Sequence, residues 1–337
     1  MLRKFSGRLC LRFVTPKRFA HVHKHDHTCG SGCNHTHHTV EEPQPRPIKE
    51  FDLNNIKKSI SEHAGQDIPL SEIPEEEINL AFSEVVTGVN KHNREQFIYS
   101  TWIQDEDLRL FYLTLIYLNG ELLRIKEKVR TPGSGEIRFA WWKANLKSSM
   151  GGIPPKVPVL IALSYFSKKY NLTYHELEFK WTQPPDMQAI EGYGEGIYSS
   201  ILYMMLDAIN YRTTHSAHVA SHIGKCYGIS LLLRGTAYHA EKNRTTFLPA
   251  SVCAKYGVTE EDIYKKQYTK SIGDAVFEVA DQAKAHLDAA RDHAKSIIDP
   301  PTDYKRVLQI ATFCDLFLYR LQKVQVPSKL QSNKEQQ

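Results

Sequence analysis

The densest group of metal-binding side chains lies near the N-terminus. Residues 21–38 hold seven of the sixteen histidines and two of the six cysteines. Zinc and copper take imidazole and thiolate ligands, and the Gly/Ser spacing lets a short tract fold around an ion. The candidate ligands are His25, His27, Cys29, Cys33 and His35. The Cys-x3-Cys spacing differs from the usual x2 knuckle, so a solvated tail that chelates metal adventitiously is the alternative.

A second group of histidines falls on one face of an expected helix. His215, His218 and His222 are spaced i, i+3 and i+7, which brings them to one side of that helix. Three imidazoles so placed could hold a transition metal, with His239 approaching from elsewhere in the fold. The spacing identifies no partner carboxylate, and helical histidines mostly pack or cap. We therefore favour a structural role for these residues.

The elements that position these residues are expected to be helices. Apolar residues recur at helical spacing from about residue 53 onward, and few runs alternate with period two. Ser71 is the expected cap of an early helix, with Pro74 in its first turn. Further helices are expected over residues 109–129, 136–146, 157–170, 186–210, 215–240, 259–266, 271–297 and 304–324. The fold class is all-α, in one domain.

The segments outside this domain differ from it in composition. Residues 1–20 contain Arg and Lys but no acid, with Leu and Phe interspersed, which is typical of a mitochondrial transit peptide. A merely basic tail is the alternative. Residues 21–50 form an expected disordered linker, which contains the His/Cys tract and three prolines. The helical domain is assigned to residues 51–324, and residues 325–337 are expected to be a disordered tail.

The charge distribution argues against a nucleic-acid binder. The formal net charge is +5, but seven basic residues precede the first acid, Asp26. The chain after residue 25 therefore sums to −2, with no block of like charge to neutralise a phosphate backbone. No stretch reaches the 18 apolar residues of a spanning helix, and 110–120 reads as a buried helix segment.

Several ordered motifs resemble the squalene/phytoene synthase superfamily. They are Tyr117-Leu-Asn-Gly-Glu-Leu-Leu-Arg-Ile-Lys-Glu, Gly135-Glu-Ile-Arg-Phe-Ala-Trp-Trp-Lys, Gly224-Lys-Cys-Tyr-Gly-Ile-Ser-Leu-Leu-Leu-Arg-Gly and Thr246-Phe-Leu-Pro. The similarity extends over roughly residues 80–300. It implies an isoprenoid-synthase-like helical bundle with a central cavity, in which active members bind magnesium and prenyl diphosphates.

The resemblance fails where active members carry their acidic motifs. The first motif region reads Leu123, Arg124, Ile125, Lys126 and Glu127, so Glu127 is the acid that remains. The second motif positions read Gly228, Leu231, Arg234, Gly235 and His239, of which Arg234 matches the family. Magnesium needs several carboxylates, and without it the ionisation of an allylic diphosphate lacks its main electrostatic stabilisation. No catalytic residue and no magnesium cofactor is therefore expected.

Within the superfamily, the sequence most resembles a catalytically degenerate mitochondrial branch, the assembly factors for respiratory complex I. The nearest stretches are Ala217-His-Val-Ala-Ser-His-Ile-Gly-Lys and Leu233-Arg-Gly-Thr-Ala-Tyr-His. This branch implies a matrix protein that associates peripherally with the inner membrane. It also implies complex I subunits or assembly intermediates as partners, and a lipid or isoprenoid as a candidate ligand.

Two other functions stay open from the residues alone. A divergent squalene/phytoene synthase would need a metal site rebuilt from Glu121, Glu127 and His239. An exposed charge or a buried ion pair with Arg124 or Arg234 is the favoured role for the two glutamates. A metal-handling protein would act through residues 21–38, and removal of that tract would then abolish function. The sequence favours a non-enzymatic assembly factor over both.

Overall fold

The computed structural model describes residues 68–125, 134–172, 183–265 and 269–332, with side chains up to residue 323. All of these belong to one compact unit, Asp52–Gln337. Every regular element in these ranges is a helix, which confirms the all-α prediction. The predicted transit peptide, linker and His/Cys metal tract lie outside the described residues.

The N-terminal helices pack mainly on one another. They are η1 (Leu70–Glu72), α2 (Glu75–His92), α3 (Arg94–Ser100), α4 (Glu106–Leu123), α6 (Ser134–Met150) and α7 (Pro158–Tyr170). α2 contacts α3, α4 and α7, and α6 packs on α7. The centre of this group is α4, whose buried residues include Phe111, Tyr112 and Leu115. The prediction that 110–120 is a buried helix segment is confirmed.

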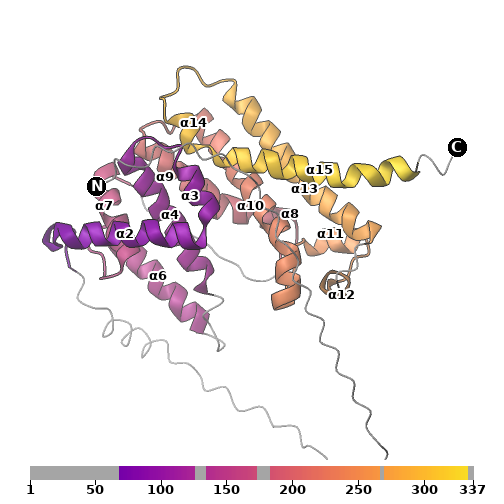
Figure 1. Cartoon of the computed structure of the whole chain (residues 1–337), viewed down its shortest axis with the longest axis horizontal. Coiled ribbons are helices and arrows are strands. Elements are labelled where there is room, and N and C mark those ends of the chain that lie inside the picture. The colour runs from indigo at the N-terminus through magenta and orange to yellow at the C-terminus, as the bar shows by residue number, and fades with distance from the viewer. Residues whose placement is uncertain (1–67, 126–133, 173–182, 266–268, 333–337) are drawn as a thin grey trace, which may run out of the picture. The chain divides into compact units, whose positions relative to one another are not determined.

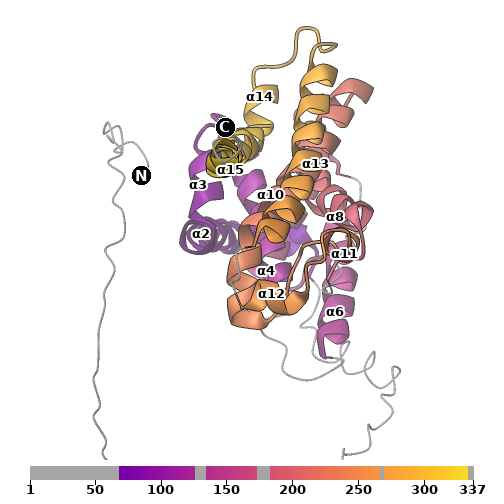
Figure 2. The ribbon, with the colours of Figure 1, turned by 90° about the vertical axis from the view of Figure 1, so that its right-hand side faces the viewer.

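The C-terminal helices surround the long helix α10 (Figures 1 and 2). They are α8 (Met187–Gly194), the π-helical η2 (Glu195–Ser199), α9 (Ser200–Ala208), α10 (Thr214–Asn243), α11 (Ala250–Lys255), α12 (Glu260–Tyr264), α13 (Lys270–Ala294), α14 (Tyr304–Val307) and α15 (Ile310–Ser332). α10 packs against α8, η2, α9, α12, α13 and α15. The contact between α4 and α9 joins the two groups.

Some helix boundaries differ from the prediction for identifiable reasons. Ser71 lies in η1, and α2 begins after Pro74, because a residue that precedes proline is disfavoured in the helical conformation. The expected helix over 186–210 contains the π-helical turn η2, which follows Gly194. α15 continues to Ser332, past the predicted end at residue 324. Apolar periodicity identifies the packed part of a helix, and a helix can extend beyond it.

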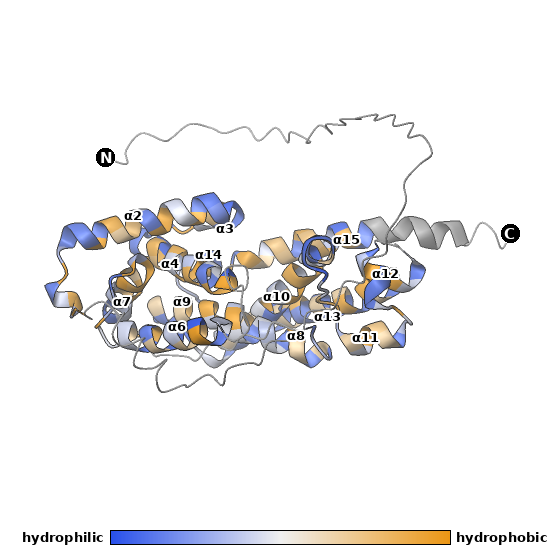
Figure 3. Ribbon diagram, turned by 90° about the horizontal axis from the view of Figure 1, so that it is seen from below, coloured by the Kyte–Doolittle hydropathy of each residue, from blue (hydrophilic) through white to orange (hydrophobic). Residues whose placement is uncertain are grey.

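Helix α2 is amphipathic rather than uniformly apolar. Figure 3 shows hydrophilic and hydrophobic residues mixed along α2, whose buried side chains are Ala81, Val85 and Val89. Across the described ranges, none of the helices has the length and apolar character that crossing a bilayer requires.

Candidate functional site

The first motif region lies at the C-terminal end of α4. Arg124 caps this helix and forms an ion pair with Glu121. Its guanidinium also lies 5.9 Å from the centre of the Tyr117 ring. The expected ion pair for Glu121 is thus confirmed, and the charge of Arg124 is already balanced. Leu123 is half-buried beside it, and Glu127 lies outside the described residues.

The second motif begins on α10 with a helix–helix contact. Gly228 is buried against Gly194 of α8, and a Cβ at position 228 would come within 2.6 Å of the Gly194 Cα. Real Cβ atoms do not approach backbone this closely, so any side chain here would push α8 away. The position that would carry a polar group in active members therefore serves close packing.

The remaining second-motif residues are also held by local contacts. Arg234 donates to Glu95 of α3 at 2.7 Å and lies 4.8 Å from the centre of the Phe313 ring. His239 lies 3.1 Å from the Asn243 side chain and packs edge-on against Phe247. Leu231 and Gly235 are half-buried. Arg234 thus links α10 to α3 and α15.

A hydrogen-bonded group of large side chains lies between α3, α4 and α10. Tyr112 of α4 donates to the Gln96 side-chain oxygen, and the Gln96 amide donates to the Tyr227 hydroxyl. All three residues are almost completely buried. Tyr198 of η2 extends the group, with its ring 4.8 Å from that of Tyr227. We call Gln96, Tyr112, Tyr198 and Tyr227 the tyrosine core.

The tyrosine core is electrically neutral under ordinary conditions. Burial raises the pKa of Tyr112 and of Tyr227 well above the usual value for tyrosine, and it also raises the pKa of Tyr198. A neutral hydroxyl can donate or accept a hydrogen bond, but it supplies no charge to hold a metal ion or a diphosphate. Gln96 was missed in the sequence because α3 has too few residues for a periodic pattern.

Two histidines of α10 contact histidines of α13, and residue spacing along one helix could not predict these contacts. His218 and His222 stack on His293 of α13, and His222 also contacts His286. His215 is exposed, and His239 lies about 25 Å further along the helix than His222. Within the described ranges, no three His, Cys, Asp or Glu side chains are arranged to hold a metal ion. The favoured structural role agrees with this arrangement.

These features place the chain in a known family. The chain belongs to the squalene/phytoene synthase family, whose sequence profile matches residues 90–325. The fold is also that of solved members. It is similar to the squalene synthase HpnC from Alicyclobacillus acidocaldarius, with a TM-score of 0.60 and 12% identity over 75% of this chain and 97% of that one. It is likewise similar to a dehydrosqualene synthase solved with a ligand, with a TM-score of 0.56 and 15% identity over 72% and 86%.

Similar proteins with curated names identify the branch of the family that the chain resembles in sequence. The chain is similar to the mouse protein named NADH dehydrogenase (ubiquinone) complex I, assembly factor 6, at 34% identity over 61% of this chain and 63% of that protein. The human protein of the same name is 31% identical over 70% of this chain and 72% of its own length. A Dictyostelium discoideum homolog is 27% identical over 86% and 81%. The resemblance to the assembly-factor branch is confirmed.

Proposed function

We propose that this chain is a mitochondrial factor for the assembly of respiratory complex I, and that it works by binding rather than by catalysis. The observation that carries the proposal is its similarity to proteins named complex I assembly factor 6, from mammals to Dictyostelium discoideum. In the proposal, the prenyl-synthase scaffold presents a surface to complex I subunits or to an assembly intermediate.

The geometry of the motif positions supports a non-catalytic role. Ionisation of a prenyl diphosphate requires magnesium ions that several carboxylates hold. Gly228 is committed to a helix contact, while Arg124 and Arg234 are paired with Glu121 and Glu95. Of the motif positions that the structure describes, Gly228, Arg124 and Arg234 offer neither the carboxylate ligands nor the unbalanced charge that the reaction needs.

A protein partner is favoured over an isoprenoid in the centre of the bundle. Between α3, α4 and α10, the buried side chains of Tyr112, Gln96 and Tyr227 in the tyrosine core hydrogen-bond to one another. An apolar chain inserted there would strand buried hydroxyl groups, at about 1–3 kcal/mol for each. A lipid or isoprenoid ligand remains a secondary proposal, which lipid extraction of the purified protein tests.

Two further parts of the proposal concern location and metal. We place the protein in the matrix, peripherally on the inner membrane, which protease protection and carbonate extraction of mitochondria test. A zinc or copper site in the N-terminal tract is a separate proposal. Its test is the metal content of the full chain before and after replacement of His25, His27, Cys29, Cys33 and His35.

Affinity purification of the tagged full chain from mitochondria tests the function directly. A matrix protein of similar size with the same tag is the control. The proposal predicts complex I subunits or biogenesis factors in the eluate of this chain alone. It also predicts that cells without the chain lose assembled complex I on native gels and regain it when the chain is restored. Normal complex I in such cells would contradict it.

A further inference from the structure

Four histidines meet where α10 and α13 pack together. They are His218 and His222 on α10, and His286 and His293 on α13, and we call them the histidine seam. α10 and α13 lie side by side in Figures 1 and 2. The His218 and His293 rings stack with centroids 4.9 Å apart, and the His222 and His293 rings stack at 5.5 Å.

One contact in the seam requires neutral imidazole. The Nδ1 atoms of His222 and His286 lie 2.9 Å apart. Such a hydrogen bond needs one nitrogen with a proton and one without, so the pair can hold a single proton between them. If both Nδ1 atoms are protonated, two N–H groups face each other, and two positive charges face each other as well when both rings are cationic. The contact that joins α10 to α13 at this point is then lost.

The charged groups around the seam favour a neutral His222. On α10 it faces His218 and Lys225, and on α13 it faces His286 and His293. One nearby carboxylate faces His286 of the seam, and another pairs with Lys225. Glu191 of α8 lies 3.3 Å from the Nε2 atom of His286 and accepts from the Gln282 amide at 2.6 Å. Glu195 of η2 pairs with Lys225 at 3.5 Å.

We propose that the histidine seam is a proton-sensitive contact, in which protonation of His222 loosens the C-terminal part of α13 from α10. The seam is built for this response because its members titrate near neutrality in water, and because stacked imidazoles repel one another once charged. Three of the four seam histidines are also accessible to protons, since His218 is exposed and His222 and His293 are half-buried.

The pH dependence of the opening follows from the difference in the His222 pKa between the closed and the opened form. Burial, with His286, Lys225, His293 and His218, lowers the pKa of His222 to about 4 from the ordinary 6.5. The opened form, in which the ring is solvated, takes up a proton more readily, so acid favours opening. The closed contact between α10 and α13 begins to lose stability as the pH falls below about 6.5, and this loss is complete near pH 4. With a His222 pKa of about 4 in the closed form and 6.5 in the opened form, the opening constant is about tenfold higher at about pH 5.5 than at neutral pH.

Hydrogen exchange of the full chain, read by mass spectrometry, tests this proposal. Rates are compared at about pH 7.5 and about pH 5.5 after correction for intrinsic exchange. We expect up to about a tenfold rise in opening for peptides from residues 283–294, with no comparable rise in α4 or α7. His222→Gln should abolish the rise. His215→Gln, an exposed histidine on the same helix, is the matched control and should retain it.

Several outcomes would overturn the proposal. They are an unchanged opening of residues 283–294, an equal rise in α4 and α7, or a rise that survives His222→Gln. If His222→Gln does not fold, NMR titration of the imidazoles in the unmodified chain decides. A His222 pKa well below 6.5, with line broadening in α13 as the ring charges, supports the proposal. An ordinary pKa for His222 contradicts it.

Discussion

Two stretches of α10 differ in what they present to their neighbours. The stretch from Gly228 onward carries the positions of the second motif, of which Gly228 is used for close packing and Arg234 for an ion pair. The stretch before Gly228 presents titratable imidazoles to α13, and Tyr227 at its end belongs to the tyrosine core. The second-motif stretch thus makes packing and ion-pair contacts with its neighbours, while the earlier stretch brings imidazole groups together.

The comparison separates two kinds of contact that hold α10 in the bundle. The second-motif stretch packs tightly, with Gly228 against Gly194 of α8. Next to it, the buried tyrosines and Gln96 are joined by neutral hydrogen bonds. Each of the following changes tests one of the contacts of α10 or of the helices that pack on it.

Gly228→Asp should have the largest effect. Its Cβ would overlap the backbone of Gly194, and its carboxylate would be buried. We expect a loss of about 3 kcal/mol or more of unfolding free energy. Denaturant unfolding measures it. Gly192→Ala is the matched control, because nothing lies within 4 Å of its Cβ. It should stabilise the helix by about 0.5–1 kcal/mol. A tolerated Gly228→Asp would show that the position is not committed to packing.

Gln96→Leu should have the next largest effect. It removes the hydrogen-bond partner of both Tyr112 and Tyr227. Each stranded hydroxyl costs about 1–3 kcal/mol, and denaturant unfolding should show the sum. Tyr319→Phe, at a residue that is 53% exposed, is the control and should change stability by less than about 0.5 kcal/mol. If Gln96→Leu is equally harmless, the tyrosine core does not hold the centre together.

Glu195→Gln should have a smaller, pH-dependent effect. Burial raises the pKa of Glu195, but hydrogen bonds from Ser221 and Tyr203 and the charge of Lys225 outweigh it, so the net pKa lies below 4.5. The ionised form therefore stabilises the fold above pH 4.5, and this stabilisation is lost as pH falls through the folded-state pKa. Unfolding at about pH 7 and about pH 3 measures it.

The difference in stability between the native chain and Glu195→Gln should shrink at the lower pH. Glu76→Gln, on the exposed face of α2, is the control. A difference that is constant with pH would show that Glu195 contributes through its shape rather than its charge.

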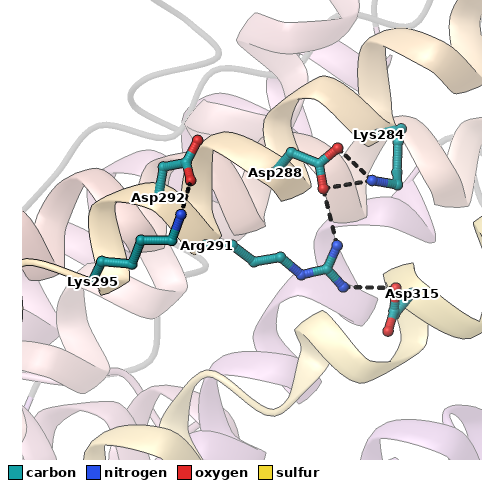
Figure 4. Close-up of polar contacts among 6 residues, drawn as sticks. All are labelled: Lys284, Asp288, Arg291, Asp292, Lys295 and Asp315. Atoms are coloured by element: carbon teal, nitrogen blue, oxygen red, sulfur yellow. Dashed lines mark hydrogen bonds and ion pairs between the residues drawn. The ribbon is translucent and has the colours of Figure 1, made fainter.

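Asp315→Asn should have the smallest effect. Figure 4 shows Arg291 of α13 between Asp288 of its own helix and Asp315 of α15. The N–O distance is 3.0 Å to Asp288 and 2.8 Å to Asp315. The side chains of Arg291 and Asp315 are 48% and 60% exposed, so the pair is screened by water. We expect a loss of about 0.5 kcal/mol or less, which added salt should remove. A larger loss in thermal unfolding would mean that α15 depends on this pair.

Sequence patterns predicted the helices well because apolar spacing is a local property. The buried segment of α4 and the helical span of α10 follow from neighbouring residues. Contacts between distant helices are not local. The approach of Gly228 to Gly194, and the pairing of His222 with His286, join residues that no spacing rule connects. The π-helical turn was missed for the same reason, because it lies where α8 and η2 pack on α10.

The central claim is that the motif positions serve packing and not catalysis. The most direct test is incubation of the purified full chain with farnesyl or geranylgeranyl diphosphate and magnesium, with product detection by mass spectrometry. We predict no diphosphate release or condensation above that of a heat-denatured sample, from the same preparation that captures complex I components. Magnesium-dependent formation of a condensed prenyl product would contradict the account.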